Sequence, residues 1–260
     1  MSAEEDLQRE ITRAALRALH GTGFALAGSG AIREHGLVER PTRDVDLFTS
    51  DPDVAAFDSA VKNLVDVLGE GAGLEVDVVR RAERFARLRV TAADGQSVDM
   101  DLAVDWRESE PVTLSIGPVL SLQDAVGNKV SALYSRAEAR DYLDVDAVRA
   151  SGKFTDDELI GSAAERDAGF EVPMFARQLD QVQRLTPERV AEYGVDVAQL
   201  DAIKGRFEQW SKTLRGEVPA VDEHAEKVRR LANRDVPVRG SDRVKPPSSP
   251  SSPKGQGRGR

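Results

Sequence analysis

Two segments of the chain combine strand-like apolar residues with paired aspartates, and they restrict the fold more than any other feature. Residues 44–48 are Asp-Val-Asp-Leu-Phe, and residues 98–102 are Val-Asp-Met-Asp-Leu. Side chains alternate between the two faces of a β-strand, so each segment has an apolar face and an acidic face. Aspartate is disfavoured in strands. We therefore expect two strands that bury their apolar faces in the core. The four carboxylates on the opposite side are unfavourable in a strand, so their presence needs a reason.

A divalent cation is one such reason. Carboxylates a few ångströms apart repel one another, and a metal ion neutralises them directly. Mg²⁺ prefers oxygen ligands of this kind, and substrate phosphates usually complete its coordination. Asp44 and Asp46 would form the site with either Asp99 or Asp101, and the spacing alone leaves that choice open. The ordinary alternative is an Asp-x-Asp pair on a solvent-facing strand or turn that binds nothing.

Gly28-Ser29-Gly30 lies between a predicted strand at 24–27 and a predicted helix at 31–35. Backbone amides at the start of a helix suit a phosphate group. A tight strand-to-helix turn is the commoner use of glycines at such a place. The segment is not a Walker loop, because no Gly-Lys-Ser/Thr follows, and it lacks the third glycine of the dinucleotide-binding fingerprint.

The whole pattern predicts an α+β protein in two parts. Helices at 5–20 and 53–68 surround strands at 24–27, 45–48, 74–79, 85–90 and 98–104, with Asp94-Gly95 as a hairpin turn. This order predicts a mixed, largely antiparallel sheet flanked by helices. Beyond Pro118 the pattern is helical, over residues 121–150, 155–167, 173–185, 187–193 and 196–215. We expect a core domain over 1–118, a helical domain over 119–232 and a disordered basic tail over 233–260.

Composition limits the partners and the compartment. The net charge is −9, but residues 235–260 hold six Lys or Arg and two Asp, a balance of +4 that leaves −13 for the rest. An acidic body argues against broad nonspecific nucleic-acid binding, although a local basic patch is still allowed. The chain has no cysteine, which excludes disulfides and thiolate metal sites. No apolar stretch is long enough to cross a bilayer and no signal peptide is recognisable, so we expect a cytoplasmic protein without membrane contact.

A second polar cluster falls within the predicted helix at 121–150. It consists of Lys129, Arg136, Arg140, Asp141 and Asp144. Taken alone, these side chains are typical of solvated ion pairs along one helix, each worth about 0.3–0.5 kcal/mol. By the same interpretation Lys129 is an ordinary surface lysine.

The two clusters together resemble a known family. Residues 27–48, AGSGAIREHGLVERPTRDVDLF, resemble the signature of polymerase-β-like nucleotidyltransferases, and they are most similar to the AbiEii/AbiGii-type and mycobacterial MenT toxins. The signature places Gly-Gly or Gly-Ser before a short helix and Arg-x-Thr-x-Asp-hydrophobic-Asp-Leu, here from Arg40 to Leu47. Residues 122–145 resemble the family's later segment with Lys, Arg and Arg-Asp-x-x-Asp. The likeness covers residues 24–148, although the gap from Ser29 to Asp44 is longer than in the tightest form of the signature.

This resemblance implies a polymerase-β-like nucleotidyltransferase core with a helical C-terminal domain, which uses an NTP and Mg²⁺ or Mn²⁺. It also implies a role for individual residues. The implied metal ligands are Asp44, Asp46 and Asp101, of which Asp101 also activates the acceptor hydroxyl, with Asp99 as the competing candidate. The implied nucleotide-binding residues are Gly28, Ser29, Gly30, Lys129 and Arg136. Lys129 would bind the triphosphate and Asp141 would lie in the same site. Arg140 and Asp144 would support that site.

The resemblance further implies the toxin of a bacterial toxin–antitoxin system. Such a toxin would transfer nucleotides from an NTP to the 3′ end of tRNA and so block translation and growth, and a cognate antitoxin would be its partner. One alternative is an aminoglycoside-like small-molecule nucleotidyltransferase that confers resistance, because an acidic body favours a cationic acceptor. The other is a non-catalytic nucleotide-binding module, against which the carboxylates, Ser29 and Lys129 all argue.

Overall fold

A seven-stranded sheet forms the centre of the protein, whose computed structural model describes residues 3–42 and 44–218. The strands are β1 (Ala25–Leu26), β2 (Asp44–Thr49), β3 (Glu75–Ala82), β4 (Phe85–Thr91), β5 (Ser97–Val104), β6 (Val112–Leu114) and β7 (Gly117–Val119). Their order across the sheet is β3-β4-β5-β2-β1-β7-β6. The β2–β5 and β1–β7 pairs are parallel and the other four pairs are antiparallel. The predicted mixed, largely antiparallel sheet is therefore confirmed.

The register of β2 and β5 brings the aspartates together. Asp44 is the partner of Asp99, and Asp46 is the partner of Asp101. Both strands alternate between buried apolar residues and partly exposed acids, as the sequence predicts. One face of the sheet is thus apolar and the other face carries two adjacent rows of carboxylates.

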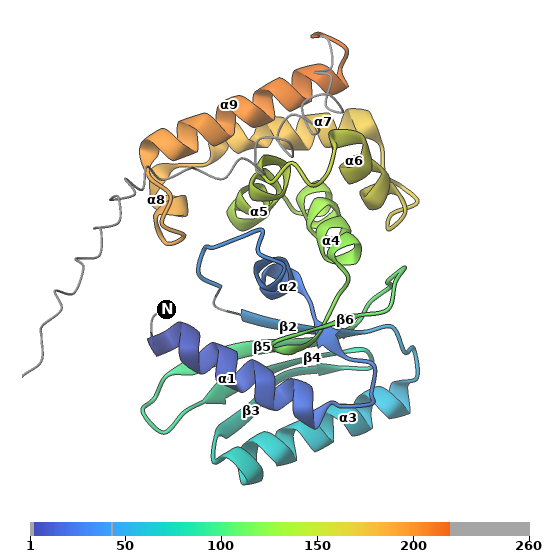
Figure 1. Ribbon diagram of the computed structural model, residues 1–260, viewed down its shortest axis with the longest axis vertical. Coiled ribbons are helices and arrows are strands. Elements are labelled where there is room, and N and C mark those ends of the chain that lie inside the picture. The colour runs from blue at the N-terminus through green and yellow to red at the C-terminus, as the bar shows by residue number, and fades with distance from the viewer. Residues whose placement is uncertain (1–2, 43, 219–260) are drawn as a thin grey trace, which may run out of the picture.

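Helices α1 (Ala3–Ala18) and α3 (Val54–Asp66) lie along the apolar face of the sheet (Figure 1). A single π-helical turn, η1 (Val67–Gly71), continues α3. The opposite face is covered over β2 by the short helix α2 (Gly28–Glu34), which in turn lies beneath α4 (Leu122–Ser135). α2 begins at Gly28, three residues before the helix predicted at 31–35, and Gly28 itself has a φ of 57° at the tight turn from β1 into the helix.

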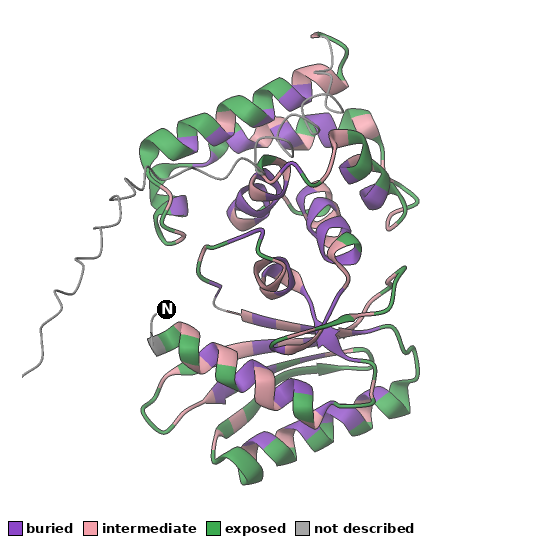
Figure 2. Cartoon of the chain, in the orientation of Figure 1, coloured by how far each residue is buried: buried purple, intermediate pink, exposed green. Residues whose placement is uncertain are grey.

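The remaining helices pack beside α4 and on its outer side (Figure 1). They are α5 (Ala139–Ala150), α6 (Asp156–Ala164), α7 (Val172–Asp180), the 3-10 turn η2 (Gln181–Arg184), α8 (Pro187–Ala191) and α9 (Val197–Leu214). Figure 2 shows α9 with buried residues toward the other helices and exposed residues along its outer side. Leu200, Ile203, Phe207 and Trp210 form that buried stripe, which has the spacing of an amphipathic helix.

Three expectations differ from the structure or lie outside it. The helix expected at 121–150 is interrupted at residues 136–138, where Ala137 has a φ of 52° and ends α4. Strands β6 and β7 are not anticipated by the pattern, and the expected boundary at residue 118 falls inside β7. The division into two domains stays a prediction, and its parts at 219–232 and 233–260 lie outside the described residues.

Among the helices that are described, none has the length and apolar character needed to span a bilayer.

Candidate active site

Asp46 is at the centre of the acidic face. Its backbone carbonyl accepts a hydrogen bond from Ala27 N at 2.8 Å, which ties β2 to the start of α2. Burial of its carboxyl group, together with the negative charges of Asp44 and Asp101, raises the pKa of Asp46 to about 6, although Lys129 and Arg140 act in the opposite direction. A bound cation would offset both the loss of solvation and the repulsion between these carboxylates.

Gly28 allows the backbone of α2 to approach this carboxylate. A Cβ atom added at Gly28 would lie 1.8 Å from Oδ2 of Asp46, far closer than atoms can pack. The φ of Gly28 is also +57°, in the left-handed region that favours glycine. Glycine is therefore required here both by the backbone conformation and by the distance to Asp46.

Ser29, Arg40, Lys129 and Asp144 form a hydrogen-bonded cluster beside Asp46. The Nζ of Lys129 donates to Ser29 Oγ and pairs with Asp144 Oδ2, both at 2.8 Å. Arg40 donates to both oxygens of Asp144 at 2.7 Å and to Ser29 Oγ at 2.7 Å. Asp144 is completely buried, and Lys129 is only 5% exposed, so the interpretation of Lys129 as a surface lysine is wrong. The cluster joins α2, α4 and α5 through four polar side chains.

Arg136, Arg140 and Asp141 lie where α5 begins. Arg136 donates to both oxygens of the buried Asp141 at 2.9 Å, and the backbone N–H of Glu138 also donates to that carboxylate. Arg140 Nη1 pairs with Asp44 Oδ2 at 2.7 Å. Asp141 therefore holds Arg136 and the N-terminus of α5, while Arg140 reaches one of the aspartates on β2.

Two arginines on β4 cover the aspartates of β5. Arg87 donates to both oxygens of Asp101, at 2.7 and 2.6 Å, and Arg89 donates to both oxygens of Asp99, at 2.9 and 3.2 Å. We did not anticipate either arginine from the sequence. The signal was present, because the hairpin turn at Asp94-Gly95 sets the register that pairs Arg87 with Asp101 and Arg89 with Asp99.

The donor set fits a divalent cation in its chemistry. Asp44, Asp46 and Asp101 supply hard oxygen ligands on adjacent strands, and burial together with the neighbouring carboxylates raises the pKa of Asp46. Within residues 3–42 and 44–218, however, no three acidic groups are arranged as a ready-made metal site. Asp44 and Asp101 are instead turned to Arg140 and Arg87.

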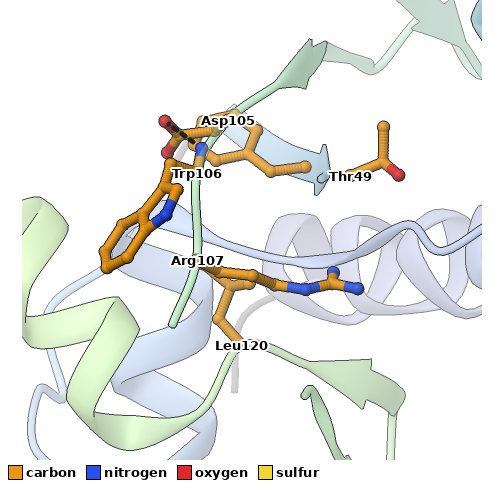
Figure 3. Close-up of a pocket in the computed structure, with 6 residues that line it drawn as sticks. Thr49, Asp105, Trp106, Arg107 and Leu120 are labelled. Carbon is orange, nitrogen blue, oxygen red and sulfur yellow. Dashed lines mark hydrogen bonds between the residues drawn. The ribbon is translucent and has the colours of Figure 1, made fainter. Parts of the chain in front are cut away.

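A small pocket at the end of β2 is separate from this cluster. It is lined by Phe48, Thr49, Asp105, Trp106, Arg107 and Leu120 (Figure 3). Trp106 is 52% exposed, and the guanidinium of Arg166 lies 5.1 Å from the centre of its ring. None of the residues predicted to carry chemistry lines this pocket.

The comparison with known sequences identifies the class of protein. A profile described as "Nucleotidyl transferase AbiEii toxin, Type IV TA system" matches residues 11–234. This chain belongs to the AbiEii nucleotidyltransferase toxin family, as its sequence motifs predict. It is a nucleotidyltransferase of a toxin–antitoxin system, which implies an NTP substrate and an antitoxin partner. A search of curated proteins gave no match.

Several solved structures are similar to this chain at low sequence identity. JHP933 from Helicobacter pylori is 16% identical with a TM-score of 0.52, over 89% of this chain and 99% of that chain. A putative nucleotidyltransferase from H. pylori is 17% identical with a TM-score of 0.49, over 91% of this chain and 100% of that chain. MenT4, a nucleotidyltransferase toxin from Mycobacterium tuberculosis H37Rv, is 17% identical with a TM-score of 0.48, over 88% and 91%. At this identity the likeness to JHP933 supports the fold alone.

The structure brings most of the predicted site residues to one place. Asp44, Asp46 and Asp101 share a sheet face, and Gly28 and Lys129 lie near Asp46. Gly30 packs against Leu26 instead, because a Cβ there would lie 3.0 Å from a methyl group of Leu26. The roles of all these residues stay predictions. Asp144, named from the sequence only as a supporting residue, is the group on which Ser29, Arg40 and Lys129 converge.

Proposed function

We propose that this toxin transfers nucleotides from an NTP to the 3′ end of tRNA in a metal-dependent reaction, which blocks translation and growth. It would act in the cytoplasm, where a cognate antitoxin neutralises it. The observation that carries the site assignment is Asp46, which lies beside Gly28, Lys129 and two further carboxylates. These residues bring together cation ligands, the backbone at the start of α2 and the positive charge of Lys129.

The proposed reaction is an in-line displacement at the α-phosphate of the NTP. The 3′-hydroxyl oxygen of the acceptor forms a bond to that phosphorus, the bond to the bridging oxygen breaks, and pyrophosphate leaves. Asp101 accepts the proton of the hydroxyl group. Mg²⁺ or Mn²⁺ held by Asp44, Asp46 and Asp101 would supply Lewis acidity to the hydroxyl and to the leaving group.

The cluster around Ser29 would receive the nucleotide. The hydroxyl of Ser29 and the backbone of Gly28 and Gly30 lie at the start of α2, where amides favour an anion. Lys129 would offset triphosphate charge and Arg136 would contribute a second cation. Arg40 and Asp144 hold Ser29 and Lys129 in place by direct hydrogen bonds, and we assign them that positioning role. Asp141 would act in the same site through Arg136.

A small cationic acceptor, such as an aminoglycoside, fits the site less well. The overall charge of −9 favours such a molecule. However, arginines occupy the sheet face next to the aspartates, with Arg87 on Asp101 and Arg140 on Asp44. Once released from these carboxylates, the guanidinium groups would bind the phosphates of an anionic acceptor such as RNA.

Incubation with each α-labelled NTP, Mg²⁺ and total tRNA tests the proposal. We expect label at the 3′ end of tRNA, loss of transfer on chelation with EDTA, and at least a hundredfold slower transfer by Asp46→Asn. Label that appears on an aminoglycoside or a protein while tRNA stays unlabelled would overturn the choice of acceptor. Transfer that persists in EDTA would overturn the metal dependence.

A further inference from the structure

The part of the acidic sheet face over β3, β4 and β5 carries arginines that the nucleotide site does not use. Arg80 and Arg87 are direct partners across the β3–β4 pair, where a β-bulge interrupts the register between Val78 and Arg80. The guanidinium of Arg80 lies 5.4 Å from the ring centre of Phe85. Phe85 precedes Arg87 by two residues on β4, so both side chains are on the same face of the sheet. Arg80 and Arg87 are thus exposed cross-strand partners on this face, and Arg87 is paired with Asp101.

Arg87 engages the carboxylate that the proposed reaction needs. It donates to both oxygens of Asp101, so it competes with a cation or a proton for that carboxylate. The side chain of Arg87 is 47% exposed, whereas that of Asp101 is 18% exposed. An ion pair at this level of exposure is worth about 1 kcal/mol or less, so a competing anion readily displaces it.

Arg80 gives such an anion a second contact. Like charges placed directly opposite on neighbouring strands are destabilising, and Arg80 forms no ion pair within the described part of the chain. A phosphate between the two guanidinium groups would relieve this repulsion, since arginine binds phosphate oxygens in a planar, bidentate manner.

We propose that Arg80 and Arg87 bind a phosphate of the acceptor RNA strand and that this contact draws Arg87 away from Asp101. The inference rests on the proposed function in taking RNA as the acceptor. It makes the third carboxylate available only when an acceptor strand is in place. An NTP bound without RNA would then meet a site whose base is still covered by Arg87.

Arg89 offers a matched comparison on the same strand. It pairs with Asp99 through both oxygens, and Asp77 on β3 adds a further negative charge. Its side chain is 50% exposed, close to the value for Arg87. Arg89 is therefore satisfied by two carboxylates and lacks an arginine partner across the strand pair, so we assign it no part in binding.

Binding of a fluorescent tRNA transcript to the full chain in EDTA, without NTP, tests the phosphate contact. We expect Arg80→Gln and Arg87→Gln each to weaken binding about five- to tenfold at 100 mM salt and to lower the salt slope of log K by about one. Arg17→Gln, on an exposed position of α1, is the charge control and should change affinity less than twofold. If Arg80→Gln and Arg87→Gln both bound the transcript with the affinity and the salt slope of wild type, the proposal would be overturned.

Mn²⁺ titration of the same proteins without RNA tests the release of Asp101. We expect Arg87→Gln to bind Mn²⁺ about fivefold more tightly than wild type, because Asp101 is no longer engaged, while Arg89→Gln changes less than twofold. An arginine that merely held Asp101 in place would give weaker Mn²⁺ binding on substitution. Weaker Mn²⁺ binding by Arg87→Gln would therefore overturn the proposal. Tighter Mn²⁺ binding by Arg89→Gln alone would also overturn it, because Asp99 would then be the third carboxylate.

The two proposals fail in different ways. If wild type transfers no label to RNA, the acceptor in the proposed function is wrong. If wild type labels tRNA while Arg80→Gln and Arg87→Gln bind RNA and Mn²⁺ as wild type does, only the role of these arginines is wrong.

Discussion

Asp46 and Asp144 both lie near Lys129, yet their pKa values are shifted in opposite directions. For Asp46, burial and the charges of Asp44 and Asp101 outweigh Lys129 and raise its pKa to about 6. For Asp144, burial also acts to raise the pKa, but Lys129 and Arg40 outweigh it and the pKa is lowered. Lys129 and Arg40 together thus compensate the charge of Asp144, whereas Lys129 leaves Asp46 with uncompensated charge that a bound cation would offset.

This difference predicts opposite effects of two isosteric substitutions on stability. A native pKa of about 6 against 3.8 in the unfolded chain means that ionised Asp46 destabilises the fold, with no cost below about pH 4 and the full cost above about pH 6. Asp46→Asn should therefore raise the free energy of unfolding of the metal-free protein by about 1–2 kcal/mol at pH 7.5. Urea unfolding at pH 7.5 and pH 4 measures this gain, which should vanish at pH 4.

Asp144→Asn provides the contrast. The lowered pKa means that Asp144 contributes stability above about pH 4, and this is lost as the pH falls further. Because Lys129 and Arg40 would lose their buried counter-charge, we expect a loss of about 3–5 kcal/mol at pH 7.5. Equal effects of the two asparagine variants in the same urea experiment would contradict this account of the charges.

Gly28 gives a prediction about packing at the site. Gly28→Ala introduces both a strained φ and a collision with Asp46, so we expect a loss of about 2–4 kcal/mol in the free energy of unfolding. Gly36→Ala is the control, because Gly36 has a φ of 71° but no atom within 4 Å of the added Cβ. It should cost only about 1 kcal/mol. Equal losses for both variants would show that Asp46 does not approach α2 as described.

At the scale of elements, the break between α4 and α5 decides the geometry of the site. Residues 136–138 interrupt the helix, and the new helix starts with Asp141 bound to Arg136. The turn allows α5 to direct Arg140 to Asp44 and Asp144 to Ser29. Residues 136–140 are Arg-Ala-Glu-Ala-Arg, which favours helix by local propensity. These tertiary contacts override that propensity, and the sequence pattern alone does not reveal them.

The break also yields a prediction. Ala137 adopts a φ of 52°, which is costly for a residue with a Cβ, so Ala137→Gly should raise the free energy of unfolding by about 0.5–1 kcal/mol. Ala132→Gly, inside α4, should instead lower it by about 1 kcal/mol. Thermal unfolding of both variants checks the pair, and a destabilised Ala137→Gly would argue for a continuous helix.

Other elements show how far the sequence alone reaches. The alternation in β2 and β5 predicts one acidic face correctly, because burial of the apolar face leaves only one orientation for each strand. The pairing of Asp44 with Asp99 and of Asp46 with Asp101 is a long-range register, which no local pattern reveals. Strands β6 and β7 are three residues each, with Gly117 and Pro118 in β7, too short and irregular for a periodic signal.

In the whole molecule, the sheet and the helical layer meet at the site. The sheet supplies Asp44, Asp46 and Asp101, and the helices above it supply Lys129, Arg136 and Arg140. The strands and helices that carry these residues lie on either side of α2 (Figure 1). If these groups transfer nucleotides to tRNA as proposed, the toxicity depends on the aspartates of the sheet and the cations of the helices being held together.

Sequencing of tRNA 3′ ends in cells that express the toxin without antitoxin tests this claim most directly. With wild-type protein we expect growth arrest and extra nucleotides at tRNA 3′ ends. With Asp46→Asn at equal abundance, we expect normal growth and unmodified ends. Growth arrest by Asp46→Asn, or arrest by wild type with all tRNA ends unmodified, would contradict the account.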